Sequence, residues 1–199
     1  MPLDRHHRRP LGLAVFLVIA GAGGFVAAFA LTVERIASLA DPRAVLACDF
    51  SLLVQCGANL ESPQGAVFGF PNPLLGIAGF TAVIAVGVGV LAGGRFARWF
   101  WALFTVGVTL AFAFVLWLIG QSIFVLGTLC PWCMVVWAVT IPLFYAVLAH
   151  SVRAGIVPAP TRVRSGAATL MTWLPLVTIL SYLAVAVVAQ LRLDVLDYL

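Results

Sequence analysis

The chain has 199 residues, of which 63% are hydrophobic and only 9% are charged, and its mean hydropathy is +1.13. A water-soluble domain of this size needs far more polar surface, so these values exclude a soluble protein and predict an integral membrane protein. The net charge of +4 comes entirely from arginines. In a membrane protein this small excess is not a sign of nucleic-acid binding.

Five apolar stretches are long enough to cross a bilayer as helices, which takes about 20 residues each. In chain order they cover residues 11–33, 74–92, 99–118, 129–149 and 168–189. Helices are favoured over strands because the apolar and polar residues do not alternate. We therefore expect an all-α integral membrane protein with a single membrane domain over residues 1–199. It would comprise a four-helix transmembrane bundle within residues 10–150, a long loop at 34–73, and a fifth transmembrane helix at 168–190.

The first apolar stretch has an alternative interpretation as part of a cleaved signal peptide. Arginines precede it, and Ala28-Phe29-Ala30 has the small-x-small pattern of a cleavage site. The apolar run is longer than the hydrophobic region of a typical signal peptide, which favours a membrane span.

The arginines indicate how the spans are oriented. In a five-span arrangement, one side of the membrane carries Arg5, Arg8, Arg9, Arg95, Arg98, Arg153, Arg162 and Arg164. The other side carries Arg35, Arg43 and Arg192 together with Glu34, Asp41, Asp49, Glu61, Asp194 and Asp197. Because cytoplasmic loops are enriched in arginine and lysine, we expect the N-terminus in the cytoplasm and the C-terminus outside.

The four cysteines form two pairs. Cys48 and Cys56 lie in the long loop, and Cys130 and Cys133 form a C-x-x-C motif at the start of the fourth span. The predicted orientation places all four on the outer, oxidising side of the membrane. If Cys130 is the N-cap of the fourth span, Pro131 occupies the first helical position, where its missing N–H is not needed. The exposed N–H groups and the helix dipole at this end favour a thiolate.

The two pairs together suggest an electron relay. A disulfide on a loop is able to meet two partners in turn, first a soluble protein dithiol and then the C-x-x-C pair at the membrane. Electrons would pass between the pairs by thiol-disulfide exchange, and a lipid-soluble acceptor would then take them at Cys133.

The cysteines have two other interpretations. A four-sulfur metal site is disfavoured because seven residues separate Cys48 from Cys56, which is a poor metal-binding spacing, and because no histidine is expected on that side of the membrane; we therefore expect no metal. Structural disulfides are the second alternative, but a bond between Cys130 and Cys133 would constrain almost nothing.

Three motifs in combination resemble the vitamin K epoxide reductase family. They are Cys48-Asp49 with Cys56, then Phe68-Gly69-Phe70-Pro71-Asn72 before the second span, and Cys130-Pro131-Trp132-Cys133 at the start of the fourth. The resemblance covers roughly residues 10–150. In another bacterial family of membrane proteins that form disulfides, the C-x-x-C motif comes in the first outer loop, so the order of the two pairs is reversed.

The resemblance implies a role for each cysteine. Cys48 would exchange with a thioredoxin-like or DsbA-like partner protein, Cys56 would exchange with Cys130, and Cys133 would donate electrons to a quinone such as menaquinone. In bacterial members the result is oxidation of secreted-protein thiols and reduction of the quinone. We therefore expect a location in the bacterial plasma membrane, with the active site on the extracytoplasmic side.

Three further side chains are candidates for contact with the quinone. Asn72 matches a family asparagine that hydrogen-bonds a quinone oxygen, although Pro71-Asn72-Pro73 would also form a turn by itself. Trp137 stands where mammalian members have a tyrosine that bonds the quinone; Trp137 and Trp132 could stack on the quinone ring or serve only as membrane-interface anchors. Asp49 is expected to act as a helix cap or a loop tie.

Many bacterial relatives continue into a fused thioredoxin-like domain after the fifth span. The present sequence has none after residue 190, so we expect the dithiol partner to be a separate protein. The alternatives to the relay are a quinone-epoxide reductase and a non-enzymatic membrane channel or scaffold with structural disulfides.

Overall fold

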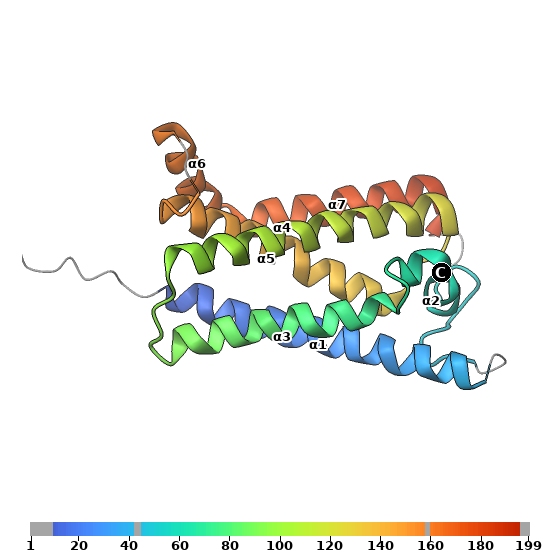
Figure 1. Ribbon diagram of the computed structural model, residues 1–199. Coiled ribbons are helices and arrows are strands. Elements are labelled where there is room, and N and C mark those ends of the chain that lie inside the picture. Colours follow the sequence, from blue (N-terminus) through green and yellow to red (C-terminus); the bar gives the residue numbers. More distant parts are fainter. Residues whose placement is uncertain (1–9, 42–44, 158–159, 196–199) are drawn as a thin grey trace, which may run out of the picture.

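The computed structural model describes residues 10–41, 45–157 and 160–195, and these residues are almost entirely helical (Figure 1). Five of the described helices are long and apolar enough to cross a membrane, which confirms the predicted number of spans. They are α1 (Leu11–Ala40), α3 (Asn72–Leu91), α4 (Arg98–Gly120), α5 (Pro131–Arg153) and α7 (Leu174–Leu193). Among the charges used to predict orientation, Arg5, Arg8, Arg9, Arg43 and Asp197 lie outside the described residues.

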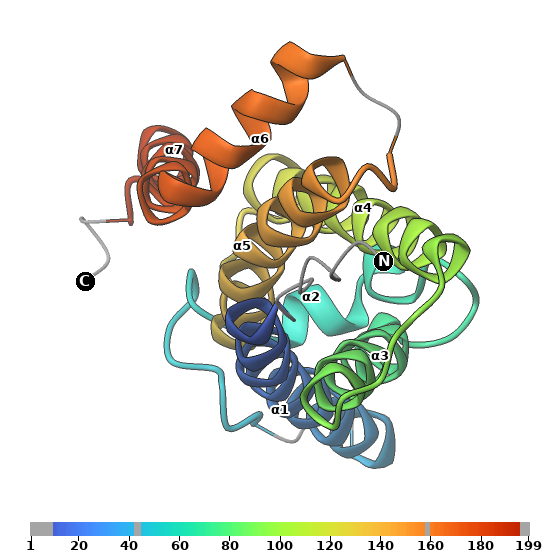
Figure 2. The same cartoon turned by 90° about the vertical axis from the view of Figure 1, so that its left-hand side faces the viewer.

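Four of these helices form the bundle, as Figure 2 shows in a view along their axes. α1 packs against both α3 and α5, and α4 packs against α5, whereas α3 and α4 make few direct contacts. Each helix contributes to the main core, for example through Leu17, Val83, Val108 and Val147. The bundle is therefore closed by packing on three sides and more open between α3 and α4.

Glycines allow α1 and α3 to approach closely. A Cβ at Gly24 of α1 would lie 2.3 Å from the ring of Phe80, and a Cβ at Gly87 of α3 would lie 2.9 Å from the Ala14 carbonyl oxygen. Real Cβ atoms do not make such contacts, so a larger residue at Gly24 would displace the Phe80 ring, and one at Gly87 would push the two helices apart.

The fifth spanning helix, α7, lies outside the ring of four and packs against α5 (Figure 2). It begins at Leu174, later than the expected start at residue 168. Residues 168–172 belong instead to the short helix α6 (Thr161–Thr172), which sequence analysis missed because it is much less apolar than the spans. Pro175 lies in the first turn of α7, where a missing N–H is tolerated.

The loop between α1 and α3 covers the end of the bundle at which α5 begins. It contains α2 (Gly57–Glu61) and a turn of 3-10 helix, η1 (Pro63–Ala66). At the same end, α4 continues into a π-helical segment, η2 (Gln121–Leu126), which stops at Gly127 in the left-handed conformation, with φ of 68°. The chain then leads directly to Cys130, the N-cap of α5.

Candidate functional site

The structure brings the two cysteine pairs together, although 74 positions separate Cys56 from Cys130. Cys48 and Cys56 form a disulfide, and Cys130 and Cys133 are free. The Cys130 Sγ atom lies 3.2 Å from the Cys56 Sγ atom. A thiol at this distance from a disulfide sulfur is in position for thiol-disulfide exchange.

Cys130 occupies the N-cap position that the sequence predicted for it. Pro131 follows in the first turn of α5, and the Cys130 sulfur accepts a hydrogen bond of 3.3 Å from the backbone N–H of Cys133. The hydrogen bond from the Cys133 thiol lowers the pKa of Cys130, and the backbone N–H groups of Cys133 and Trp132 lower it further. Burial and the nearby Asp49 carboxylate act in the opposite direction without reversing the shift. Cys130, which lies next to the disulfide, therefore forms a thiolate more readily than an ordinary cysteine.

Backbone pairing holds the disulfide loop against the start of α5. The N–H of Leu129 donates to the Leu53 carbonyl at 2.8 Å, and the N–H of Gln55 donates to the Leu129 carbonyl at 3.1 Å. These two bonds form the single β-bridge of the described residues, between Val54 and Leu129. Because Gln55 precedes Cys56 and Leu129 precedes Cys130, the bridge aligns the two reacting cysteines.

Asp49 ties the loop to itself beside the disulfide. Its Oδ1 atom accepts hydrogen bonds from the backbone N–H groups of Cys56 at 2.7 Å and Gly57 at 3.2 Å. Both donors belong to the start of α2, where N–H groups lack helical partners. The structure thus gives Asp49 the expected role of a helix cap and loop tie.

A second polar cluster fastens α2 to η2. The Asn59 side chain donates to the Thr128 hydroxyl at 2.9 Å, and the Ser122 hydroxyl donates to the Asn59 side-chain oxygen at 3.2 Å. The Ser122 hydroxyl has a single proton, which it shares between this oxygen and the Thr128 carbonyl. Ser122 and Thr128 are both buried, so these bonds satisfy groups that water does not reach.

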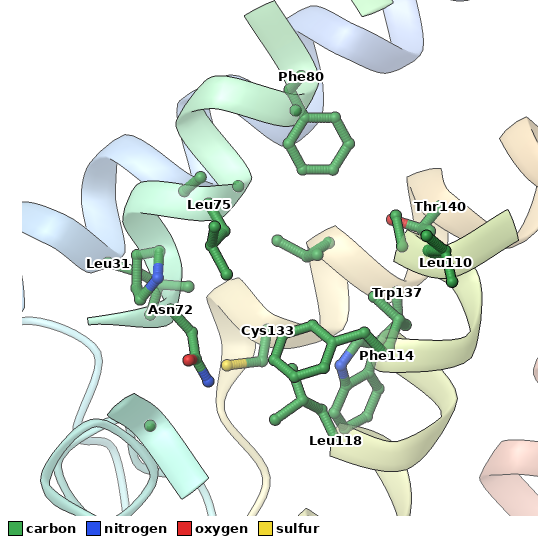
Figure 3. Close-up of a pocket in the computed structure, with 18 of the residues that line it drawn as sticks. Leu31, Asn72, Leu75, Phe80, Leu110, Phe114, Leu118, Cys133, Trp137 and Thr140 are labelled. Atoms are coloured by element: carbon green, nitrogen blue, oxygen red, sulfur yellow. The ribbon is translucent and has the colours of Figure 1, made fainter. Parts of the chain in front are cut away.

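Below the cysteines lies a cavity of about 630 Å³, enclosed mainly by α3, α4 and α5 (Figure 3). Its volume falls within the range of about 300–1,000 Å³ that is usual for small-molecule sites. The lining is predominantly apolar, with Phe80, Leu110, Phe114 and Leu118 among its residues. Cys133 lines the cavity, whereas Cys130 does not. The C-x-x-C motif therefore joins the disulfide loop on one side to an apolar cavity on the other.

Asn72 lines the same end of the cavity as Cys133 (Figure 3). Its side-chain nitrogen donates to the Gln64 carbonyl at 2.6 Å, and its side-chain oxygen accepts from the Val67 N–H at 3.1 Å. The amide therefore stabilises the turn before α3, and one N–H remains for another acceptor. Nearby, the buried Oε1 atom of Gln64 has no hydrogen-bond partner among the described residues.

Trp137 and Thr140 follow Cys133 along the cavity wall formed by α5. Both are buried and line the cavity. Within the described part of the chain, neither side chain has a hydrogen-bond partner. The indole N–H of Trp137 and the hydroxyl of Thr140 are therefore available to hydrogen-bond a ligand in the otherwise apolar cavity.

The structure does not bring Trp132 to the cavity. Trp132 packs instead against the cluster that contains the disulfide, Leu31, Leu46, Leu60 and Cys130. Cys133 packs against the same cluster but also lines the cavity, because successive residues of a helix point about 100° apart. The lining of this cavity therefore gives no support to stacking of Trp132 on a quinone, which stays a prediction.

Cys48, Asp49 and Cys56 also bring three potential metal-ligand atoms within 4.8 Å of one another. In the structure the two sulfurs are bonded to each other, and a metal prefers the thiolate form. A metal site built from these groups would first require reduction of the disulfide.

Several residues of the site were missed by sequence analysis. They are Asn59, Gln64, Gln121, Ser122, Thr128 and Thr140. The available signal was that Gln121 and Ser122 are polar residues at the end of an apolar run. Their partners lie 57 and 63 positions away, and no single sequence specifies such pairs.

The comparison with protein families agrees with this geometry. The model of the vitamin K epoxide reductase family matches residues 15–148, which include all four cysteines and the cavity-lining parts of α1, α3, α4 and α5. No curated protein matches the chain. The match covers more than half of the sequence and identifies a membrane oxidoreductase of the quinone or epoxide reductase kind. The chain therefore belongs to the vitamin K epoxide reductase family.

Proposed function

We propose that this protein is a membrane thiol-disulfide oxidoreductase that oxidises a separate thioredoxin-like protein and reduces a quinone. The observation that carries this proposal is the position of Cys130 and Cys133. Cys130 lies 3.2 Å from the Cys56 sulfur, and Cys133, one helical turn away, lines the apolar cavity. This arrangement supports passage of electrons from the loop pair to the cavity.

The proposed cycle balances two electrons and two protons. The partner dithiol reduces the disulfide between Cys48 and Cys56 and becomes a disulfide itself. Cys56 then attacks Cys130 of an oxidised Cys130–Cys133 pair, and Cys48 displaces Cys130 from the mixed disulfide. The result is the state seen here, with the loop pair oxidised and the helix pair reduced. Oxidation of Cys130 and Cys133 back to a disulfide then delivers two electrons and two protons to the quinone.

The cavity suits a quinone dissolved in the bilayer. Leu75 and Gly79 of α3 and Gly107 and Leu110 of α4 line the cavity and are exposed, which is consistent with an opening between these two helices. This opening lies where α3 and α4 make few contacts. A quinone ring would lie beside Cys133, and a long prenyl tail would extend between the two helices towards the lipid. Asn72 and Trp137 would offer N–H donors to the ring oxygens, and menaquinone is the acceptor we favour.

The surroundings of Cys48 support a protein as the electron donor. Val45 and Leu52 flank it and are 86% and 87% exposed, and Phe50 is also exposed. The Cys48 sulfur itself is buried, so a donor must both bind this loop and displace part of it. Such a loop suits a partner that presents a reactive cysteine on an apolar surface. With the orientation inferred from the arginines, the exchange takes place on the extracytoplasmic side of the bacterial plasma membrane.

The test is anaerobic quinone reduction followed by absorbance, with purified protein and a small dithiol as the electron donor. The wild type should reduce menaquinone, and Cys133→Ala should not. Cys48→Ala should lose turnover with a protein dithiol while keeping part of the turnover with the small dithiol. Absence of quinone reduction by folded wild type, with several quinones and quinone epoxides tried, would contradict the proposal and favour a non-enzymatic membrane protein.

A further inference from the structure

Helix α5 contains a proline in its interior, at a point next to the proposed quinone site. Pro142 has no N–H, so the carbonyl of Ala138, four residues earlier, loses its helical hydrogen bond. Ala138 directly follows Trp137, which lines the cavity. In the hydrocarbon core no water is present to replace the missing donor, and the carbonyl must find a partner within the protein.

Tyr182 of α7 supplies this partner. Its hydroxyl donates a hydrogen bond to the Ala138 carbonyl. Tyr182 lies near the middle of α7, well inside the segment expected to cross the membrane. Tyr182 lies outside residues 15–148, the region matched by the family model, whereas α5 lies almost entirely within that region. A residue of the fifth spanning helix thus completes the backbone hydrogen bonding of α5.

The proline separates two parts of α5 with different tasks. The part before it carries Cys133, Trp137 and Thr140, which line the cavity. After Pro142, Leu143 still lines the cavity, and Ala146 and Val147 then belong to the main core of the bundle. A break in helical hydrogen bonding between the two parts makes the angle of the first part adjustable, so whatever holds the break sets the position of the cavity wall.

Further contacts between α7 and the first part of α5 support this assignment. Ala189 of α7 is buried in one cluster with Trp137 and Leu129, and Val185 and Leu193 pack against the same cluster. α7 therefore backs the wall of the cavity on the side away from the proposed quinone.

We propose that Tyr182 is a positioning residue for the quinone site: by bonding the Ala138 carbonyl, it fixes the part of α5 that carries Cys133 and Trp137. The inference rests on the proposed function, because it assumes that the quinone binds in the cavity. It gives the fifth helix a role in the quinone step that does not depend on a fused domain.

The test compares Tyr182→Phe with the wild type in anaerobic quinone reduction, with Tyr145→Phe as the matched control. Tyr145 also joins α5 to α7, through a 3.0 Å hydrogen bond between its hydroxyl and that of Ser181. Ser181 keeps a bond to the Val177 carbonyl when this hydroxyl is removed, so the control leaves no backbone group without a partner. Tyr182→Phe should raise the KM for the quinone roughly three- to tenfold, with the KM for the small dithiol unchanged. Tyr145→Phe should change both values less than about twofold.

A rescue experiment separates positioning from general damage to the fold. Pro142→Ala restores an N–H that bonds the Ala138 carbonyl within α5. In that background, Tyr182→Phe should leave the quinone KM within about twofold of its value in Pro142→Ala alone. The inference is overturned if Tyr182→Phe does not change the quinone KM of an active enzyme, if it lowers quinone and dithiol turnover equally, or if Pro142→Ala gives no rescue. Inactivity of the wild type would instead contradict the proposed function.

Discussion

The two cysteine pairs are held in place by different means. The helix pair is built into the first turn of α5, where Cys130 caps the helix and Pro131 starts it. The loop pair depends on hydrogen bonds to Asp49 and on the short backbone bridge to Leu129. Changes in the loop should therefore impair electron transfer between the pairs, and changes in the bundle should impair the reaction with the quinone.

Asp49→Ala is the change in the loop that should slow electron transfer between the cysteine pairs most. It removes the acceptor for the Cys56 and Gly57 N–H groups, and hydrogen bonds to a charged group contribute about 1.5–3 kcal/mol. We expect transfer from Cys56 to Cys130 to slow roughly 10- to 100-fold. Stopped-flow reaction with a small dithiol, followed by acid quench and thiol counting, measures this step.

Asp49→Asn provides the matched comparison, because it keeps a side-chain oxygen as acceptor but removes the charge. It should lose less activity than Asp49→Ala. Equal loss in both variants would show that the charge, rather than the loop tie, is what matters at this position.

In the bundle, the corresponding test is to fill the cavity with Gly79→Leu. A Cβ at Gly79 would meet no atom within 4 Å, and Gly79 lines the cavity, so the added side chain takes space from the ligand rather than from the protein. We expect the quinone KM to rise roughly tenfold while exchange between the cysteine pairs continues.

Gly120→Leu is the control for this change. A Cβ at Gly120 would likewise meet no atom within 4 Å, but Gly120 is not among the residues that line the cavity. Its quinone KM should stay near that of the wild type. A similar rise in both variants would mean that bulk on the helix surface, and not occupancy of the cavity, causes the effect.

A smaller effect is expected where the loop meets η2. Asn59→Ala removes the bonds to Thr128 and Ser122, which link α2 to the segment before Cys130. Ser122 keeps the Thr128 carbonyl as acceptor, so the net loss is one neutral hydrogen bond, about 1 kcal/mol, and transfer between the pairs should slow about fivefold. An unchanged transfer rate, measured by the same quench experiment, would show that the backbone bridge alone aligns the pairs.

The pH dependence of the transfer sharpens the comparison further. In the reverse transfer, Cys130 attacks the Cys48–Cys56 disulfide as a thiolate, so the rate of this attack should rise with pH until the pKa of Cys130 is passed. Because hydrogen bonds from Cys133 and Trp132 lower this pKa, the rise should end below the usual pKa of a thiol. Cys133→Ala removes the largest contribution and should move the end of the rise to higher pH. An identical profile in both proteins would contradict the assigned hydrogen bond.

The sequence was informative about features that depend on local or averaged properties. The five spans follow from long apolar runs, and the N-cap position of Cys130 follows from the proline beside it. The sequence was less informative about orientation around a helix axis. Trp132 and Cys133 are neighbours in the chain and both pack against the disulfide cluster, but only Cys133 also lines the cavity.

Apart from the approach of Cys56 to Cys130, which the family resemblance implied, contacts between distant segments could not be predicted. Gln64 bonds Gln121, and Tyr182 bonds the Ala138 carbonyl, across separations of 57 and 44 positions. Pro142 lies inside α5, and nothing in the sequence indicated which side chain would complete the backbone there. α6 was missed because membrane spans are recognised by hydropathy, and α6 lacks it.

The central claim is that electrons cross between the pairs through Cys56 and Cys130. The most direct measurement is peptide mass spectrometry of the Cys48→Ala/Cys133→Ala variant after treatment with a mild thiol oxidant, with Cys56→Ala/Cys133→Ala as the control. We predict a disulfide between Cys56 and Cys130 in most of the first variant and little cross-linking in the second. Recovery of Cys56 and Cys130 as free thiols in folded protein would contradict the claim.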